Sequence, residues 1–358
     1  MSSVTIQTNK VICKQPGNYL GWPTIGRLSD GQILVVFSGD RETHHCPYGK
    51  NQLIRSVDNA ETWSPAITIN NTPLDDRDTG ITVLRSGTIV VSWMTDETWE
   101  LLAKFAGFVP EQTLTAWRRH CDKITPNVRR QWSGCWTRRS TDGGVSWEPA
   151  VPSVAQTPHG PIQLRNGLLL FVGVSKATGR ALVCASSTDE AKSWTQIGTF
   201  SVPDEFAKEL PFGEPHAVEL PDERIVCMWR HTPRDRPKST FFLHQCESSD
   251  GGRTWSMLRP TPIWGFPPHL IRLHSGALLV TYGYRREPFG QRACMSHDGG
   301  RTWDLENEII LRDDAPSGDL GYPATLELTP GEFLTVYYQI DPPDTKTSLF
   351  ATRWSFEG

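Results

Sequence analysis

The sequence predicts an all-β protein, a six-bladed β-propeller, and three observations lead to this fold class. A strand–turn–strand pattern occurs six times, a box of the form S-x-D-x-G-x-T-W occurs five times, and the two patterns alternate along the chain. The turn of the first pattern recurs about every 55 residues, which suits one four-stranded propeller blade with its loops. We therefore expect residues 1–358 to form a single propeller domain.

The strand–turn–strand pattern is an apolar run, a turn and a second apolar run, as expected of a β-hairpin. Glycine favours such turns because it adopts positive φ without steric cost. The six copies span residues 26–37, 82–93, 162–171, 218–229, 271–282 and 326–337, with turns at Gly31, Gly87, Gly167, Glu223, Gly276 and Gly331.

One interval between turns is about 24 residues longer than the blade period, which indicates an insertion in blade 2 at about residues 96–132. Residues 97–108 and Gln112–Cys121 are its helix candidates. Blade 6 has too little chain after Gly331 for four strands. We expect residues 4–13 to supply its missing strand, because this closes the ring and removes a free sheet edge.

The five boxes have a structural explanation. Their Asp accepts backbone N–H bonds in its own turn, Gly supplies positive φ, and the Trp ring buries itself between neighbouring sheets. We therefore expect the Asp residues of these boxes to stabilise turns at the rim of the propeller rather than to act in catalysis. The boxes are 56–63, 140–147, 187–194, 248–255 and 296–303, with Asp58, Asp142, Asp189, Asp250 and Asp298.

Composition narrows the class of partner. Hydrophobic residues make up 37% and charged residues 21%, and the net charge is −4, so nothing favours nucleic-acid or membrane binding. The eight Cys are scattered without a C-x-x-C pair, and we expect neither a metal nor a cofactor. The chain start shows no secretory pattern, so we expect a reduced, cytoplasmic protein.

Candidate site residues lie where the first strand of each blade enters the central funnel. Titratable groups that converge in a concavity are the default hypothesis for a functional site. The expected catalytic set is Tyr322, Glu214, Asp78 and His45, and the expected substrate-binding set is Arg41, Arg230, Arg285, Arg292, His159, His216, His269 and Trp22.

The boxes, the period and the hairpins resemble the sialidase (neuraminidase) superfamily over essentially the whole chain. Residues 214–230 are similar to the stretch that carries the catalytic Glu and the second substrate arginine, and residues 321–331 resemble the segment with the tyrosine nucleophile. The resemblance implies an exo-acting glycosidase with Tyr322 as nucleophile and Glu214 as its partner. Arg230, with Arg285 or Arg292, would bind the anionic group of the sugar.

Two departures from that family matter. Its first-arginine motif, Tyr-Arg-Ile-Pro, falls on residues 20–23, which contain no arginine. The loop that brings the acid Asp in sialidases holds residues 42–47 here, with His44 and His45. Asp40, Asp78, His44 and His45 therefore remain open as the acid. We expect an acidic or otherwise polar sugar, not necessarily sialic acid.

Three functions remain open at this point. The first is the glycoside hydrolase just described. The second is a polysaccharide lyase or hydrolase in which His159, His216 and His269 carry out acid–base chemistry near neutral pH. The third is a non-catalytic carbohydrate-binding propeller, which the missing arginine and acid Asp favour. All three predict a carbohydrate partner.

Overall fold

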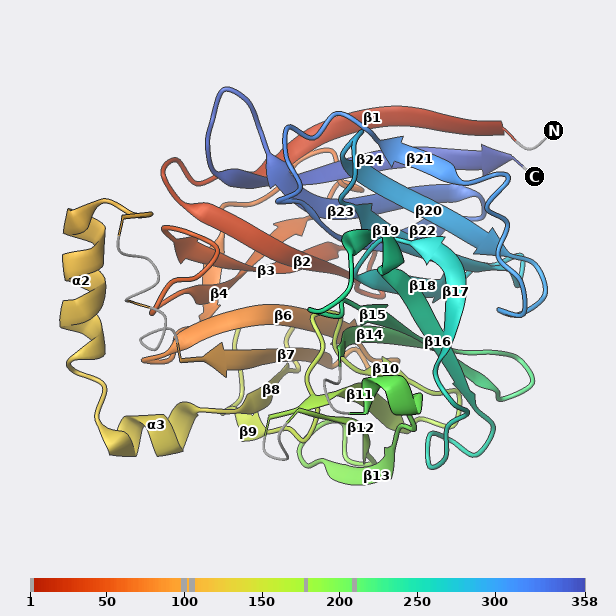
Figure 1. Cartoon of the computed structure of the whole chain (residues 1–358), viewed down its shortest axis with the longest axis horizontal. Helices are drawn as coiled ribbons and strands as arrows, with labels where there is room; N and C mark the ends of the chain where they lie inside the picture. Colours follow the sequence, from red (N-terminus) through yellow and green to blue (C-terminus); the bar gives the residue numbers. More distant parts are fainter. Residues whose placement is uncertain (1–2, 98–101, 103–106, 177–179, 208–210, 358) are drawn as a thin grey trace.

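The computed structural model describes residues 3–97, 102, 107–176, 180–207 and 211–357. Within them the chain forms six antiparallel four-stranded sheets arranged as the blades of a propeller (Figure 1). The predicted six-bladed, all-β fold is confirmed. Consecutive strands pair within each blade, as expected of hairpins, except that the N-terminal strand completes the last blade.

The strands of the first three blades are β2 (Tyr19–Arg27), β3 (Ile33–Arg41), β4 (Lys50–Ser56), β5 (Ile67–Asn70), β6 (Asp75–Val83), β7 (Ile89–Asp96), β8 (Cys135–Ser140), β9 (Val151–Pro152), β10 (Ile162–Gln163), β11 (Leu169–Ser175), β12 (Ala181–Ser187) and β13 (Thr195–Thr199). The next two blades contain β14 (Phe212–Glu219), β15 (Ile225–His231), β16 (Phe242–Ser248), β17 (Arg259–Trp264), β18 (Pro268–Arg272), β19 (Leu278–Tyr284), β20 (Gly290–Ser296) and β21 (Ile309–Arg312). The last blade is built from β22 (Gly321–Thr329), β23 (Glu332–Ile340), β24 (Thr347–Glu357) and β1 (Ser3–Cys13), and short 3₁₀ turns cover Asp204–Phe206 and Lys238–Thr240.

The ring is closed by the N-terminal strand. β1 pairs antiparallel with β24 along nearly its whole length, so the two ends of the chain share one blade (Figure 1). This is the closure that the sequence predicts. The inner strands of successive blades touch one another around the centre: β2 contacts β6 and β22, and β18 contacts β14 and β22. Side chains from distant parts of the sequence therefore meet there.

The local turn chemistry matches the predictions. The five predicted turn glycines have φ between +80° and +94°, and Glu223 takes the same left-handed conformation at +67°. Each box follows the third strand of its blade. In the Asp250 box, Ser248 Oγ lies 2.8 Å from the carboxylate, and the backbone N–H of Thr254 donates to it at 2.9 Å. The other four boxes repeat this arrangement.

The blade 2 insertion lies between β7 and β8 and contains α2 (Glu111–Cys121) and α3 (Pro126–Trp132) (Figure 1). α2 confirms the second helix candidate, whereas the first, residues 97–108, falls mostly outside the described residues. Trp117 of α2 is fully buried, and its indole N–H lies 3.2 Å from Glu42 Oε2. The insertion therefore packs on the loop of blade 1 that carries His44 and His45.

Two further properties concern the described part of the chain. No helix there is long and apolar enough to cross a membrane. All eight cysteines are free thiols.

Candidate active site

Four inner strands share one backbone irregularity at the funnel. Trp22 in β2, Asp78 in β6, Glu214 in β14 and Tyr322 in β22 have φ between +48° and +55°, and each lies where the pairing register shifts. Positive φ costs a non-glycine residue about 1–3 kcal/mol and concentrates at functional sites. The four bulges bring these four side chains together at the centre of the ring.

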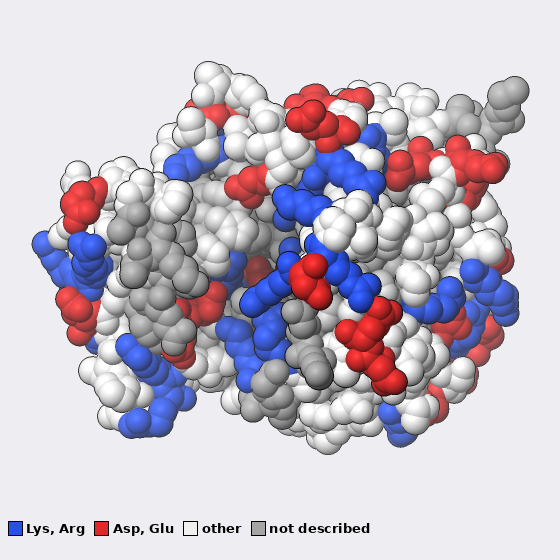
Figure 2. All heavy atoms as spheres, viewed as in Figure 1, with Lys and Arg blue, Asp and Glu red and all other residues white. Residues whose placement is uncertain are grey.

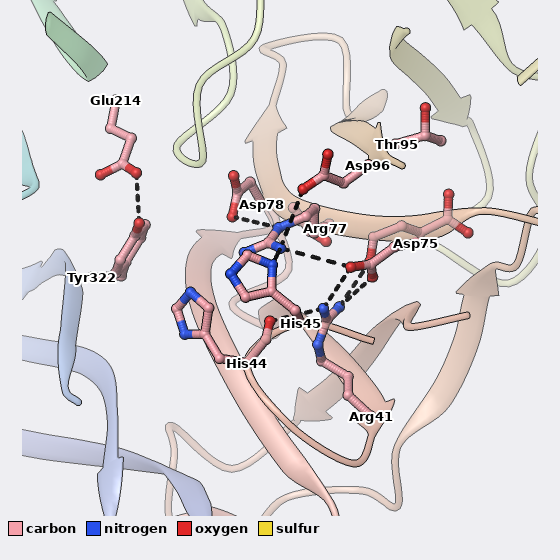
Figure 3. A network of polar contacts seen from close by, with 12 residues as sticks. Arg41, His44, His45, Asp75, Arg77, Asp78, Thr95, Asp96, Glu214 and Tyr322 are labelled. Atoms are coloured by element: carbon pink, nitrogen blue, oxygen red, sulfur yellow. Dashed lines mark hydrogen bonds and ion pairs between the residues drawn. The ribbon is translucent and has the colours of Figure 1, made fainter. Parts of the chain in front are cut away.

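The core of the site is a hydrogen-bonded pair. Tyr322 donates from Oη to Glu214 Oε1 at 2.6 Å (Figure 3). Arg230 donates from Nη1 to Glu214 Oε2 at 2.7 Å. Arg230 Nη1 also lies 3.4 Å from Tyr322 Oη. The sequence predicts all three residues for the site, and the structure brings them into contact.

The pKa values of Tyr322 and Glu214 are shifted in opposite directions, which favours a protonated phenol and an ionised carboxylate. Burial raises the pKa of Tyr322 well above its ordinary value, and the negative charge of Glu214 adds to this. Burial also acts to raise the pKa of Glu214, but the charge of Arg230 and the hydrogen bonds from Tyr322 and Arg230 bring it below its usual range. Glu214 is therefore ionised and aligned to accept the phenolic proton.

Arg285 lies on the other side of Tyr322. Its guanidinium is 5.9 Å from the centre of the Tyr322 ring, and Nη2 donates to Tyr338 Oη at 3.4 Å. Tyr338 in turn donates to Asp319 at 3.2 Å. Arg230 and Arg285 also both cover the Phe266 ring, at 4.6 and 5.0 Å from its centre. The two arginines thus form one cationic wall beside Tyr322.

Arg292, the other candidate for the third arginine, lies elsewhere. It is on β20, the third strand of its blade, and is only 4% exposed. Its guanidinium covers the Tyr284 ring at 4.7 Å and lies 4.0 Å from Glu308. The structure gives it an internal ion pair on the third strand of its blade. Of the two candidates, only Arg285 lies against Tyr322.

Two of the acid candidates, Asp78 and His45, lie beside Arg77, a residue that was not among the predicted site residues (Figure 3). Arg77 is 5% exposed and lies 3.7 Å from Asp75, 4.0 Å from Asp78 and 3.6 Å from Asp96. Its Nη1 is also 3.0 Å from His45 Nδ1. The run Asp75–Asp78, with one arginine among three acids, was the signal in the sequence for such a cluster.

The pKa values separate Asp78 from His45. Burial raises the pKa of Asp78 to about 6, against the opposing charge of Arg77 and with a further increase from Glu214. Burial, together with the charge of Arg77, lowers the pKa of His45 to about 4. Near neutral pH a fraction of Asp78 still carries a proton that it can donate, whereas His45 is neutral. Asp78 therefore has the better properties of a general acid.

His44 and Asp40, the remaining acid candidates, have other partners. His44 Nδ1 is 3.0 Å from Tyr19 Oη, which donates to Asp319 at 2.8 Å. Asp40 forms an ion pair with Lys50. His44 also contacts the Trp22 ring, 5.0 Å between centres, so it lies at the edge of the site.

Arg41 and Trp22, both expected to bind substrate, are buried in the structure. Arg41 is fully buried and pairs with the equally buried Asp75 at 2.8 Å. Trp22, 1% exposed, lies with its ring 4.9 Å from the Arg41 guanidinium and 4.4 Å from that of Arg77. The ring is 6.3 Å from Tyr322. Trp22 therefore forms a wall of the site, and Arg41 acts behind it.

The three funnel histidines form a buried cluster. The rings of His216 and His269 stack at 4.4 Å, and His159 is 5.2 and 5.0 Å from them. None is more than 8% exposed. Burial lowers all three pKa values, that of His216 to about 4. The backbone N–H of Leu270 donates to His216, which suits a neutral structural ring.

A cavity of about 610 Å³ opens beside the Tyr322–Glu214 pair. Its wall, as far as the structure describes it, contains six charged residues. The sequence predicts Asp78, Glu214 and Arg230 as site residues, but not Lys176, Arg180 and Arg234. The cavity is lined by Asp78, Met94, Gln156, Val174, Lys176, Arg180, Pro211, Phe212, Gly213, Glu214, Arg230, Thr232 and Arg234. Among the described residues, no group of three or more His, Cys, Asp or Glu side chains is arranged to hold a metal ion.

The fold and this funnel define a sialidase-like six-bladed β-propeller. A BNR repeat-like domain is recognised over residues 123–334, and the chain belongs to this family. No curated protein matches the sequence.

Several solved structures share the fold. A protein of unknown function from Dyadobacter fermentans is 21% identical, with a TM-score of 0.78 and 99% of both chains covered. The NanB sialidase of Streptococcus pneumoniae is 15% identical, with a TM-score of 0.67, covering 97% of this chain and 70% of the sialidase. The α-L-arabinofuranosidase Arb93A of Fusarium graminearum is 15% identical, with a TM-score of 0.62 and 97% of both chains covered.

Proposed function

We propose that the protein is an exo-acting glycoside hydrolase for an acidic or polar terminal sugar, with Tyr322 as nucleophile. The observation that carries this proposal is the contact of Tyr322, Glu214 and Arg230, of which Glu214 and Arg230 line the cavity. A phenol with a raised pKa attacks only if a base removes its proton, and ionised Glu214 lies 2.6 Å away.

The reaction proceeds in two displacements. Tyr322 Oη attacks the anomeric carbon while its proton passes to Glu214, and the glycosidic C–O bond breaks. Asp78 supplies the proton for the leaving oxygen. Water then attacks the anomeric carbon and gives one proton to Asp78, while the bond between this carbon and Tyr322 Oη breaks. Glu214 returns the phenolic proton to Tyr322 Oη. Arg230 and Arg285 offer forked donors to a carboxylate or hydroxyl groups of the bound sugar.

The structural relatives support this chemistry only through the fold, since a sialidase and an arabinofuranosidase share it at low identity. The substrate need not be sialic acid, because Gly21 stands where the first arginine of the sialidase motif would be. The three histidine rings contact one another, and His216 and His269 accept backbone N–H groups, which favours the hydrolase over the histidine-based lyase.

The test is a panel of chromogenic glycosides that includes a sialoside, uronides and an arabinofuranoside, assayed on the wild type and on Tyr322→Phe. We expect hydrolysis of at least one member by the wild type and its loss in the variant. Full activity of Tyr322→Phe would contradict the mechanism. Saturable glycan binding with no product from any member would instead favour the non-catalytic binding function.

A further inference from the structure

The cavity beside Glu214 carries more positive charge than the proposed chemistry uses. Four cations line it, Lys176, Arg180, Arg230 and Arg234, against the two carboxylates of Asp78 and Glu214. The protein as a whole has a net charge of −4, so this excess is local. Figure 2 shows Lys and Arg side chains in a band across the middle of the molecule.

The four cations are not equivalent. Arg230 forms an ion pair with Glu214. Lys176 donates to Thr95 O at 2.5 Å and lies 3.9 Å from Asp96. Arg180 and Arg234 are exposed, and neither has an ion-pair partner among the residues that the structure describes. In the described part of the chain, the wall of this cavity thus holds two guanidinium groups without an acidic partner.

A second observation in the same wall is independent of charge. Gln156 is 8% exposed and lines the cavity, and its Nε2 has no hydrogen-bond partner in the described structure. A buried donor without a partner costs about 1–3 kcal/mol, so such groups usually face an acceptor supplied by water or ligand. An oxygen atom of a ligand in this cavity would satisfy it.

We propose that Arg180, Arg234 and Gln156 form a second anion-binding subsite, for a carboxylate or sulfate group on the sugar next to the one that is cleaved. Planar guanidinium groups bind both oxyanions through paired donors. The subsite belongs to blades 3 and 4, whereas Arg285 and Tyr322 belong to blades 5 and 6. Asp78, the proposed donor to the leaving oxygen, lines the same cavity.

The assignment to the neighbouring sugar rests on the proposed hydrolase function, but anion binding does not. The experiment is therefore calorimetric titration at constant ionic strength with sodium sulfate, D-glucuronate and neutral D-glucose. The proteins are the wild type, the double variant Arg180→Gln/Arg234→Gln, the single variant Arg234→Gln and the control Arg272→Gln. Arg272 is a matched control because it is an exposed arginine at the far end of β18.

We expect saturable binding of at least one anion by the wild type, and affinity at least about tenfold weaker in the double variant. Arg272→Gln should bind as the wild type does, and glucose should show no such difference. A preference for sulfate indicates a sulfated sugar, and a preference for glucuronate indicates a uronic acid. Both substituted arginines are exposed, so the variants should fold as the wild type does. Arg180 has a positive φ, and the single variant Arg234→Gln tests the subsite without a substitution at that position.

Two results would overturn the subsite: no saturable anion binding by the wild type, or equal binding by the wild type and the folded double variant. Anion binding that depends on Arg180 and Arg234, together with no hydrolysis of any glycoside, would overturn the hydrolase and leave the subsite standing.

Discussion

Tyr322 and Glu214 are 108 positions apart in the sequence, yet the tyrosine hydroxyl donates a 2.6 Å hydrogen bond to the carboxylate. Both residues occupy bulges with positive φ on the inner strands of different blades. The propeller therefore maintains two strained backbone sites to make one contact. Strain of this kind is understandable where the contact serves chemistry.

Glu214→Gln should reduce kcat by about 10²–10⁴-fold, because the amide cannot accept the Tyr322 proton as a base. KM should change little, since the variant keeps the shape of the cavity. Steady-state kinetics with the glycoside identified by the panel measures both. Glu219→Gln is the matched control, because Glu219 lies on the same strand but at its far end. Unchanged kcat in Glu214→Gln would exclude its role as base.

Activity should fall on both sides of a mildly acidic optimum. Asp78 must be protonated to donate, and its pKa is raised to about 6, so kcat/KM declines as pH rises through that value. Glu214 must be ionised, and its pKa is lowered, so activity declines only at lower pH as it becomes protonated. A pH profile of kcat/KM on the wild type reports both limbs.

Asp78→Asn should remove the decline near pH 6 and lower kcat/KM by about 10²–10⁴-fold for alkyl glycosides, but less for nitrophenyl glycosides, whose leaving group needs no proton. Asp40→Asn, which alters an acid paired with Lys50, should keep the wild-type profile. If Asp40→Asn loses the alkaline limb and Asp78→Asn keeps it, the acid has been misassigned.

His269→Gln should leave the pH profile unchanged and lower thermal stability. His269 Nδ1 accepts the backbone N–H of Thr325 at 3.3 Å, so the ring is part of the packing at the base of the funnel. Thermal unfolding and activity on the same preparation separate the two effects. An inactive but stably folded variant, with an unsaturated sugar released by the wild type, would revive the lyase interpretation.

The buried Arg41–Asp75 pair should dominate stability near the site. Arg41→Met leaves Asp75 without its closest cation and should cost about 3–5 kcal/mol in the free energy of unfolding. The double variant Arg41→Met/Asp75→Leu should recover much of that loss, since the new pair is apolar and Arg77 keeps Asp78 and Asp96 as partners. Denaturant titration measures this, and equal stability of the single and double variants would contradict it.

Much of the fold was predictable because it depends on local chemistry that repeats. Gly31 and its counterparts mark turns through their own backbone freedom, and the Asp250 box encloses its hydrogen bonds within seven residues. The N-terminal closing strand followed from counting strands. No contact between distant residues was needed for these predictions.

The site was predictable only where a short segment carries it. Tyr322, Glu214 and Arg230 were identified through their segments, whereas the role of Arg77 depends on carboxylates and a histidine that meet it only in the folded chain. Arg41 and Arg292 were expected to bind substrate, but burial beside Asp75 and Glu308 gives them internal partners. A sequence position near the funnel does not determine which way a long side chain points.

The central claim is that Tyr322 becomes covalently bonded to the sugar, and the most direct test is mass spectrometry. The wild type is incubated with an activated analogue of its preferred glycoside, fluorinated beside the anomeric carbon so that the intermediate accumulates. We predict one glycosyl adduct, located on the peptide that contains Tyr322 and absent from Tyr322→Phe. An adduct on another residue, or turnover of the analogue with no adduct, would contradict the mechanism.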